Sequence, residues 1–187
     1  MKRSAYLWVL LVAVCGFAQE AVPTKGALEF QKTINAEYAN RAESPLTDAD
    51  FSTFKSLDFY PIATKYIVTA TFKRTENEKV FQMKTTSTRT PDYVKYGELR
   101  FTLDGVAYQL NVYQNIELMK KEGYHDYLFL PFSDTTCGKE SYIGGRYIDL
   151  RIPTSDTVTI DFNQAYNPYC AYNHRFSCPL VPMENNL

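Results

Sequence analysis

The feature that most constrains the fold of this chain is a two-residue turn, Asp104-Gly105, between two apolar stretches. Asp-Gly is favoured in the tightest antiparallel hairpins because both turn positions need a positive φ. A two-residue loop pairs Leu103 with Val106, Phe101 with Tyr108 and Leu99 with Leu110. All six side chains then share one face, and a shift by one residue would move every one of them to the other face. The sequence therefore predicts both the hairpin and its register.

Most of the chain beyond residue 65 has the pattern of further strands. Apolar residues alternate over 66–72, 148–152 and 158–162, and the unbroken apolar run 128–132 is typical of a strand buried on both sides. Residues 25–41 predict an amphipathic helix, and Thr47 begins a second short helix that reaches about Ser56. We expect a mainly β protein of the α+β class, with about seven strands in an antiparallel barrel or sandwich preceded by N-terminal helices.

The first 18 residues predict export. Two basic residues precede an uncharged apolar run over 5–18, which is shorter than the roughly 20 residues that a spanning helix needs. Small residues at its end are typical of a signal peptide cut after Ala18. The alternative is a lipoprotein acylated on Cys15, which Val14 disfavours because a small residue is expected there. We expect a signal peptide over 1–18 and one periplasmic or secreted globular domain over 19–187, without a membrane span.

Charge and size exclude some partners. The chain has 20 Lys and Arg against 21 Asp and Glu, so no basic excess indicates a nucleic-acid partner. A chain of 187 residues can bury one substantial core but is short for two. We expect a monomer.

A first polar stretch, residues 134–149, is not explained by packing. Its glycines could let backbone N–H groups converge on an anion, or they could simply form a connection between strands. The stretch lacks the pattern of a phosphate-binding P-loop. The strand alternation places Arg146 on the apolar side, where burying it unpaired would cost several kcal/mol. Its partner is therefore a carboxylate, from Asp134, Glu140 or Asp161, or an anionic ligand.

A second unusual stretch, residues 161–184, is rich in amides, phenols and prolines, which favours a loop held by its own hydrogen bonds. Cys170 and Cys178 are eight residues apart, and a disulfide is the default for such a pair in an exported protein. The alternative is a zinc site that adds His174, with Cys137 as a fourth ligand or as the unpaired thiol. We expect neither a metal nor a cofactor. The sequence contains no nucleophile, metalloprotease or dinucleotide motif, so catalytic residues stay unknown.

Both stretches also resemble a known family. The runs LFLPFSDTTCGKESYIGGRYIDL and DFNQAYNPYCAYNHRFSCPLVPMEN, with the upstream segments FKSLDFYPI and YVKYGELRFTLDGVAYQLNVYQN, are similar to domain of unknown function 1684, in its short exported bacterial form. The resemblance runs from about Phe30 to the C-terminus. It implies no activity. Cys137, His125 and His174 depart from the family pattern, and members usually continue for a further strand, which leaves open whether the C-terminus is complete.

Three hypotheses follow. The leading one is a binding module for a small anionic or polar ligand, at a rim formed by residues 134–149 and 161–184. The expected ligand-binding residues are Asp134, Lys139, Glu140, Tyr142, Arg146, Asp161, Asn163, Tyr166, Asn167 and Tyr172, because aromatic walls with a few convergent polar groups are typical of such sites. The second is a hydrolase that uses Asp134, Glu140 or Asp161 as general acid or base. The third is a structural lid, without a ligand, that protects a sheet edge.

Overall fold

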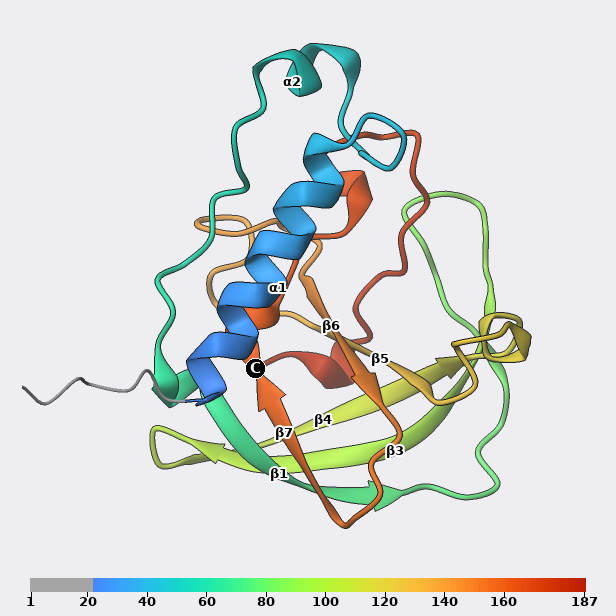
Figure 1. Ribbon diagram of the computed structural model, residues 1–187. Coiled ribbons are helices and arrows are strands. Elements are labelled where there is room, and N and C mark those ends of the chain that lie inside the picture. Colours follow the sequence, from blue (N-terminus) through green and yellow to red (C-terminus); the bar gives the residue numbers. More distant parts are fainter. Residues whose placement is uncertain (1–21) are drawn as a thin grey trace, which may run out of the picture.

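A computed structural model describes residues 22–187, so the predicted signal peptide and Cys15 lie outside the described residues. The strands form one seven-stranded sheet in which every pairing is antiparallel. The sheet is curled into a half-barrel, with the helices before it in the chain (Figure 1). This confirms the predicted mainly β fold. Among the described residues, no helix combines the length and the apolar character needed to cross a membrane.

The helices are α1 (Val22–Ala39) and α2 (Asp48–Thr53). The strands are β1 (Ile67–Arg74), β2 (Phe81–Gln82), β3 (Asp92–Leu103), β4 (Val106–Asn115), β5 (Tyr127–Phe132), β6 (Arg146–Arg151) and β7 (Thr157–Asp161). Their order in the sheet is β6-β5-β4-β3-β1-β7, and β2 pairs with β3. Two short 3₁₀ helices, η3 (Phe162–Gln164) and η5 (Met183–Asn185), follow β7 in the chain.

The hairpin of β3 and β4 has the predicted register. Leu103 lies opposite Val106, and the pairs Phe101–Tyr108 and Leu99–Leu110 follow. Asp104 and Gly105 have φ of 50° and 80°, as a tight hairpin turn requires. Leu99 and Leu110 are buried in the core of the half-barrel, so the register is fixed by the need to bury the apolar face of the hairpin.

The N-terminal helices pack outside this core. α1 buries Ala27, Ile34 and Tyr38, whereas Leu28 is 44% exposed. This face packs against the segment after β7, where the ring of Phe30 lies 6.2 Å from that of Tyr166. Thr47 caps α2 as predicted, because its side chain accepts a hydrogen bond from the Asp50 N–H. The helix ends at Thr53, slightly earlier than expected.

The C-terminal segment completes the sheet between β4 and β5. These two strands form only one registered pair, Tyr113 with Phe129. Asn185, whose side chain is fully buried, supplies hydrogen bonds beside that pair. Its Oδ1 accepts from the Asn111 N–H at 2.9 Å, and its Nδ2 donates to the Asn111 and Pro131 carbonyls at 2.8 and 2.6 Å. One amide side chain therefore joins the two strands where their backbones do not pair.

Candidate ligand-binding cavity

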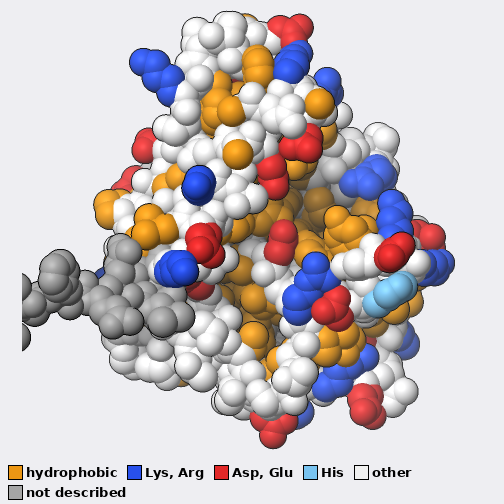
Figure 2. Space-filling model, viewed as in Figure 1, with side chains coloured by type: hydrophobic (Ala, Val, Ile, Leu, Met, Phe, Trp, Pro, Cys, Tyr) orange, Lys and Arg blue, Asp and Glu red, His pale blue; other side chains and the backbone are white. Residues whose placement is uncertain are grey.

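A cavity of about 630 Å³ lies where the ends of β5 and β7 meet the β3–β4 hairpin and the start of β6. Nine aromatic side chains line it: Tyr38, Phe59, Tyr60, Tyr66, Tyr108, Phe132, Phe162, Tyr166 and Tyr172. Figure 2 shows charged side chains spread over the face that carries α1, with hydrophobic side chains between them. The size and the aromatic walls are those of a small-molecule site.

Most of the predicted site residues line this cavity. They are Asp134, Glu140, Arg146, Asn163, Tyr166, Asn167 and Tyr172. Three others do not belong to the lining. Lys139 is exposed, Tyr142 has its hydroxyl 3.7 Å from the Cys170 sulfur, and Asp161 is buried at the end of β7. The two predicted stretches therefore meet at one rim, but not through every residue expected there.

Several walls of the cavity were missed by the sequence analysis. Residues 57–61, which precede the sheet, supply one wall, and Tyr38 of α1 supplies another. Leu103 and Tyr108, assigned above only to the hairpin, and Leu187 at the C-terminus also line it. The signal that could have indicated the first wall is Phe59-Tyr60-Pro61, a cluster of rings outside any strand pattern.

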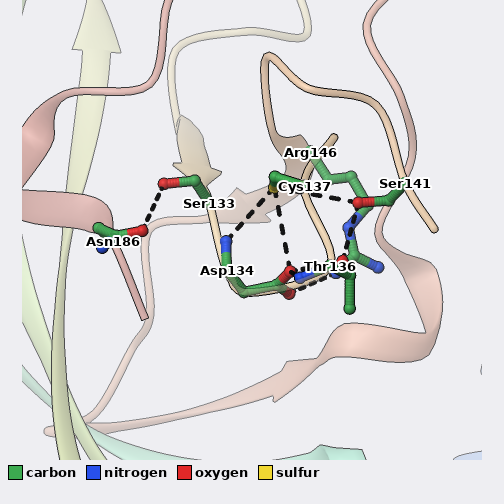
Figure 3. Close-up of polar contacts among 7 residues, drawn as sticks. All are labelled: Ser133, Asp134, Thr136, Cys137, Ser141, Arg146 and Asn186. Atoms are coloured by element: carbon green, nitrogen blue, oxygen red, sulfur yellow. Dashed lines mark hydrogen bonds and ion pairs between the residues drawn. The ribbon is translucent and has the colours of Figure 1, made fainter. Parts of the chain in front are cut away.

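Arg146 lies at the wall between Phe132 and Tyr60, with its guanidinium carbon 5.1 and 5.5 Å from the two ring centroids. Its side chain is 13% exposed, as the strand alternation predicted. Its Nη2 donates to the Asp134 carboxylate at 2.5 Å (Figure 3). This ion pair selects Asp134 from the three expected partners. The Nε is buried without a hydrogen-bond partner among the described residues, and Nη1 is accessible and also has none there.

The Asp134 carboxylate is held from both sides. Thr136 donates to its Oδ1 through the backbone N–H at 2.9 Å and through the hydroxyl at 2.5 Å (Figure 3). Burial acts to raise the pKa of Asp134, but these hydrogen bonds and the Arg146 charge outweigh it and hold the pKa below its ordinary value. The pair is therefore ionised at neutral pH.

This pair predicts a pH-dependent contribution to stability. Replacing Asp134 with Asn leaves Arg146 without its counter-charge and should lower the free energy of unfolding by about 2 kcal/mol at pH 7. A depressed carboxyl pKa stabilises the fold above the unfolded-state pKa of about 4, and this stabilisation is lost as the pH falls through the folded-state value. The difference between the two proteins in urea unfolding should therefore shrink below about pH 4.

The matched control is Asp126→Asn, which removes the Asp126–Arg151 pair. Both of those side chains are more than half exposed, so the change should cost less than about 1 kcal/mol. Equal effects of the two variants would contradict a special role for the Arg146–Asp134 pair.

The glycine-containing stretch does not form the predicted anion-binding backbone. Instead, the N–H groups of Lys139, Glu140 and Ser141 all donate to the carbonyl of Thr136, at 3.0 to 3.1 Å. The Gly138 N–H donates to the Ser141 carbonyl. These donors are used within the loop, so the alternative, a connection between strands, is the correct interpretation.

The predicted self-bonded character of the second stretch is present. Asp161 accepts from the Asn163 N–H and side chain and from Gln164, and Asn163 bonds back to the Ala63 backbone. Tyr166 donates its hydroxyl to Asp149 at 2.7 Å. Its backbone exchanges hydrogen bonds with Tyr147 at the edge strand β6. The segment therefore both covers a sheet edge and walls the cavity.

Comparison with known proteins identifies the family of this chain and a similar solved structure. A family model described as "Protein of unknown function (DUF1684)" matches residues 52–187, which include all seven strands and most of the cavity walls. The chain belongs to the DUF1684 family. The solution NMR structure of an uncharacterized protein of Haloarcula marismortui is similar to this DUF1684 chain, with 31% identity and a TM-score of 0.68. The match covers 87% of this chain and 88% of that one. No curated protein matches the sequence.

The predicted Cys170–Cys178 disulfide is not formed in this DUF1684 structure, where both residues and Cys137 are free cysteines. The two are nevertheless neighbours, because the Cys170 N–H donates to the Cys178 sulfur at 3.1 Å. Burial and then the Cys170 thiol raise the pKa of Cys178, which disfavours its thiolate. The fold does not bring the ligands of the alternative zinc site together, since His174 is exposed and no group of three or more potential metal ligands exists among residues 22–187.

Proposed function

We propose that this DUF1684 protein binds a small polar organic ligand in the aromatic cavity. The observation that carries the proposal is the cavity itself, about 630 Å³ in volume, with the half-satisfied guanidinium of Arg146 on its wall. An aromatic body can pack on the rings, while an oxygen or nitrogen acceptor of the ligand can take the hydrogen bond that Arg146 Nη1 offers.

Because of the ion pair, the ligand does not need to supply a negative charge to Arg146. Arg146 already has Asp134 as its carboxylate partner, so an anion is not required to neutralise it. Lys139, the second expected anion-binding residue, lies outside the lining. The pairing of Arg146 and the position of Lys139 therefore favour a polar ligand over an anionic ligand.

The two alternatives have less support. The hydrolase hypothesis relied on Asp134, Glu140 and Asp161. Asp134 is engaged by Thr136 and Arg146, and Asp161 is turned to the η3 backbone and away from the lining. Of the three, Glu140 is then left as the carboxylate that is free on the lining, without a second expected carboxylate to form an acid–base pair. A purely structural lid is consistent with the hydrogen bonds between Tyr166 and β6, yet it gives no reason for a cavity with nine aromatic walls.

Blocking the cavity tests the proposal. Thr135 lines the cavity and is exposed, whereas Thr154 is also exposed but lies outside it. We expect Thr135→Trp to weaken binding of a neutral probe, a dansyl sulfonamide with a hydroxyethyl arm, by about tenfold or more by fluorescence titration. Thr154→Trp should bind it as the wild type does. Equal binding in both variants, or no binding by the wild type, would contradict the proposed function.

We also propose that the chain is exported as a monomer, cut after Ala18, and that Cys170 and Cys178 are oxidised to a disulfide outside the cytoplasm. The two residues are neighbours in the fold, since the Cys170 N–H donates to the Cys178 sulfur, and an oxidising compartment favours a disulfide between such cysteines. Intact-mass measurement of the secreted protein should give a mass about 2 Da below that of the reduced form. Alkylation after denaturation should label Cys137 alone among the three described cysteines. Labelling of all three, without the mass difference, would exclude the disulfide.

A further inference from the structure

We infer that the cavity selects organic cations, ligands with an aromatic or apolar body and an ammonium-type end held at the mouth by Asp58 and Glu140. This inference rests on the proposed function, because it names the chemical class of the ligand that the same cavity takes. It starts from the charges on the lining.

The lining carries one cation and three carboxylates. Arg146 pairs with Asp134, and that pair is mostly buried. Asp58 and Glu140 remain, both exposed on the lining, and neither side chain has an ion-pair or hydrogen-bond partner among residues 22–187. Lys139 is next to Glu140 in sequence but not part of the lining. The unbalanced charge at the mouth is therefore negative, which favours a positive ligand group and opposes an anion.

The aromatic walls favour the same charge. The face of an aromatic ring carries negative potential and attracts cations. Two tyrosines of the lining already have a cation over the ring. The Lys65 nitrogen lies 4.7 Å from the ring centroid of Tyr66, and the Arg146 guanidinium lies over Tyr60. Phe59 and Tyr60, which directly follow Asp58 in sequence, contribute further rings to the same lining. An ammonium group at this mouth would meet carboxylates and ring faces together.

A second observation, independent of the carboxylates, also points to a ligand. Tyr38 lines the cavity and is 1% exposed. Its hydroxyl lies near that of Tyr172 but has no partner within hydrogen-bond distance among the described residues. Leaving such a buried hydroxyl unpaired costs about 1–3 kcal/mol. The wall thus contains hydrogen-bonding capacity that the protein's described side chains leave unused, as expected of a site that recognises polar groups.

Three matched probes test the charge preference: dansyl sulfonamides whose two-carbon arms end in an ammonium, a hydroxyl or a carboxylate. For the wild-type protein we expect the ammonium probe to bind about fivefold tighter than the hydroxyl probe, and the carboxylate probe to bind more weakly than either. In the double variant Asp58→Asn/Glu140→Gln, the affinities for the ammonium and hydroxyl probes should become equal.

The control is the double variant Glu122→Gln/Asp156→Asn, which makes the same change in net charge at exposed residues outside the cavity. It should keep the wild-type preference. Three results would overturn the inference. They are equal affinity for all three probes, tightest binding of the carboxylate probe, and loss of the ammonium preference in the control variant. In each of those cases cavity-dependent binding of the hydroxyl probe would leave the proposed function standing. If no probe binds, both fail.

Discussion

Replacing Asn185 with alanine is expected to lower the free energy of unfolding by about 3–5 kcal/mol, the largest effect of any single side-chain truncation considered for this protein. The change removes the partner of three buried backbone groups at once, the N–H and carbonyl of Asn111 and the carbonyl of Pro131. Each of these groups loses its hydrogen bond in a place with no access to solvent, because Asn185 is fully buried. The shift should appear in the urea midpoint.

Two related variants separate this role from general disturbance of the C-terminal segment. Asn185→Asp keeps an acceptor for the Asn111 N–H but cannot donate to the two carbonyls and buries a charge, so it should be as damaging as the alanine variant. Asn186→Ala removes only an exposed hydrogen bond from the Ser133 hydroxyl and should cost less than about 0.5 kcal/mol. If Asn185→Ala were equally mild, the amide would not be what joins β4 to β5.

Gly145→Ala is expected to destabilise the protein by about 3 kcal/mol, for two reasons that add. Gly145 has φ of +85°, which a residue with a Cβ adopts only under strain. A Cβ at this position would also lie 2.6 Å from both the Phe132 carbonyl oxygen and the Val181 side chain. The contact with backbone cannot relax by a side-chain rotation, so β5 and the start of β6 must separate. Thermal unfolding of the variant measures the cost.

Gly105→Ala provides the matched comparison. Gly105 has a similar φ of +80°, but no atom lies within 4 Å of the position of its Cβ. It should therefore show the backbone strain alone, about 1 kcal/mol. The difference between the two variants isolates the close approach of β5 to the residue before Arg146. Equal costs would mean that β5 and β6 move apart without penalty.

Local patterns predicted much of the fold. The Asp104-Gly105 turn fixed the register of seven residue pairs, as far as Gly97 with Val112, because turn geometry and side-chain alternation act within one hairpin. Beyond Gly97 an irregularity in β3 shifts the pairing by one residue. Thr47 capped α2, and Arg146 lay on the apolar side of β6, for similarly local reasons. Each of these predictions needed only residues close together in sequence.

The candidate site was predictable only in part, because its contacts join distant segments. The sequence offered three carboxylates for Arg146, and only the packed loop selects Asp134. The glycines of residues 138–145 suggested free N–H groups, but Thr136 accepts three hydrogen bonds from this loop. Tyr38 gave no sign of lining a cavity. The rings of residues 59–61 were a local signal for one wall, but nothing local to α1 or to that segment indicates what lies opposite.

The walls of the cavity come from segments that are far apart in the sequence. Tyr38 and residues 57–61 belong to the first third of the chain, and the residues from Phe162 to Leu187 belong to its end. Contacts between such distant segments form slowly, because a long loop must close before they contribute any stability. The β3–β4 hairpin can form early from local contacts, whereas the cavity requires the last segment of the chain to be in place. During refolding, probe fluorescence should therefore develop after the sheet signal, and recovery of binding would report on completion of the native state.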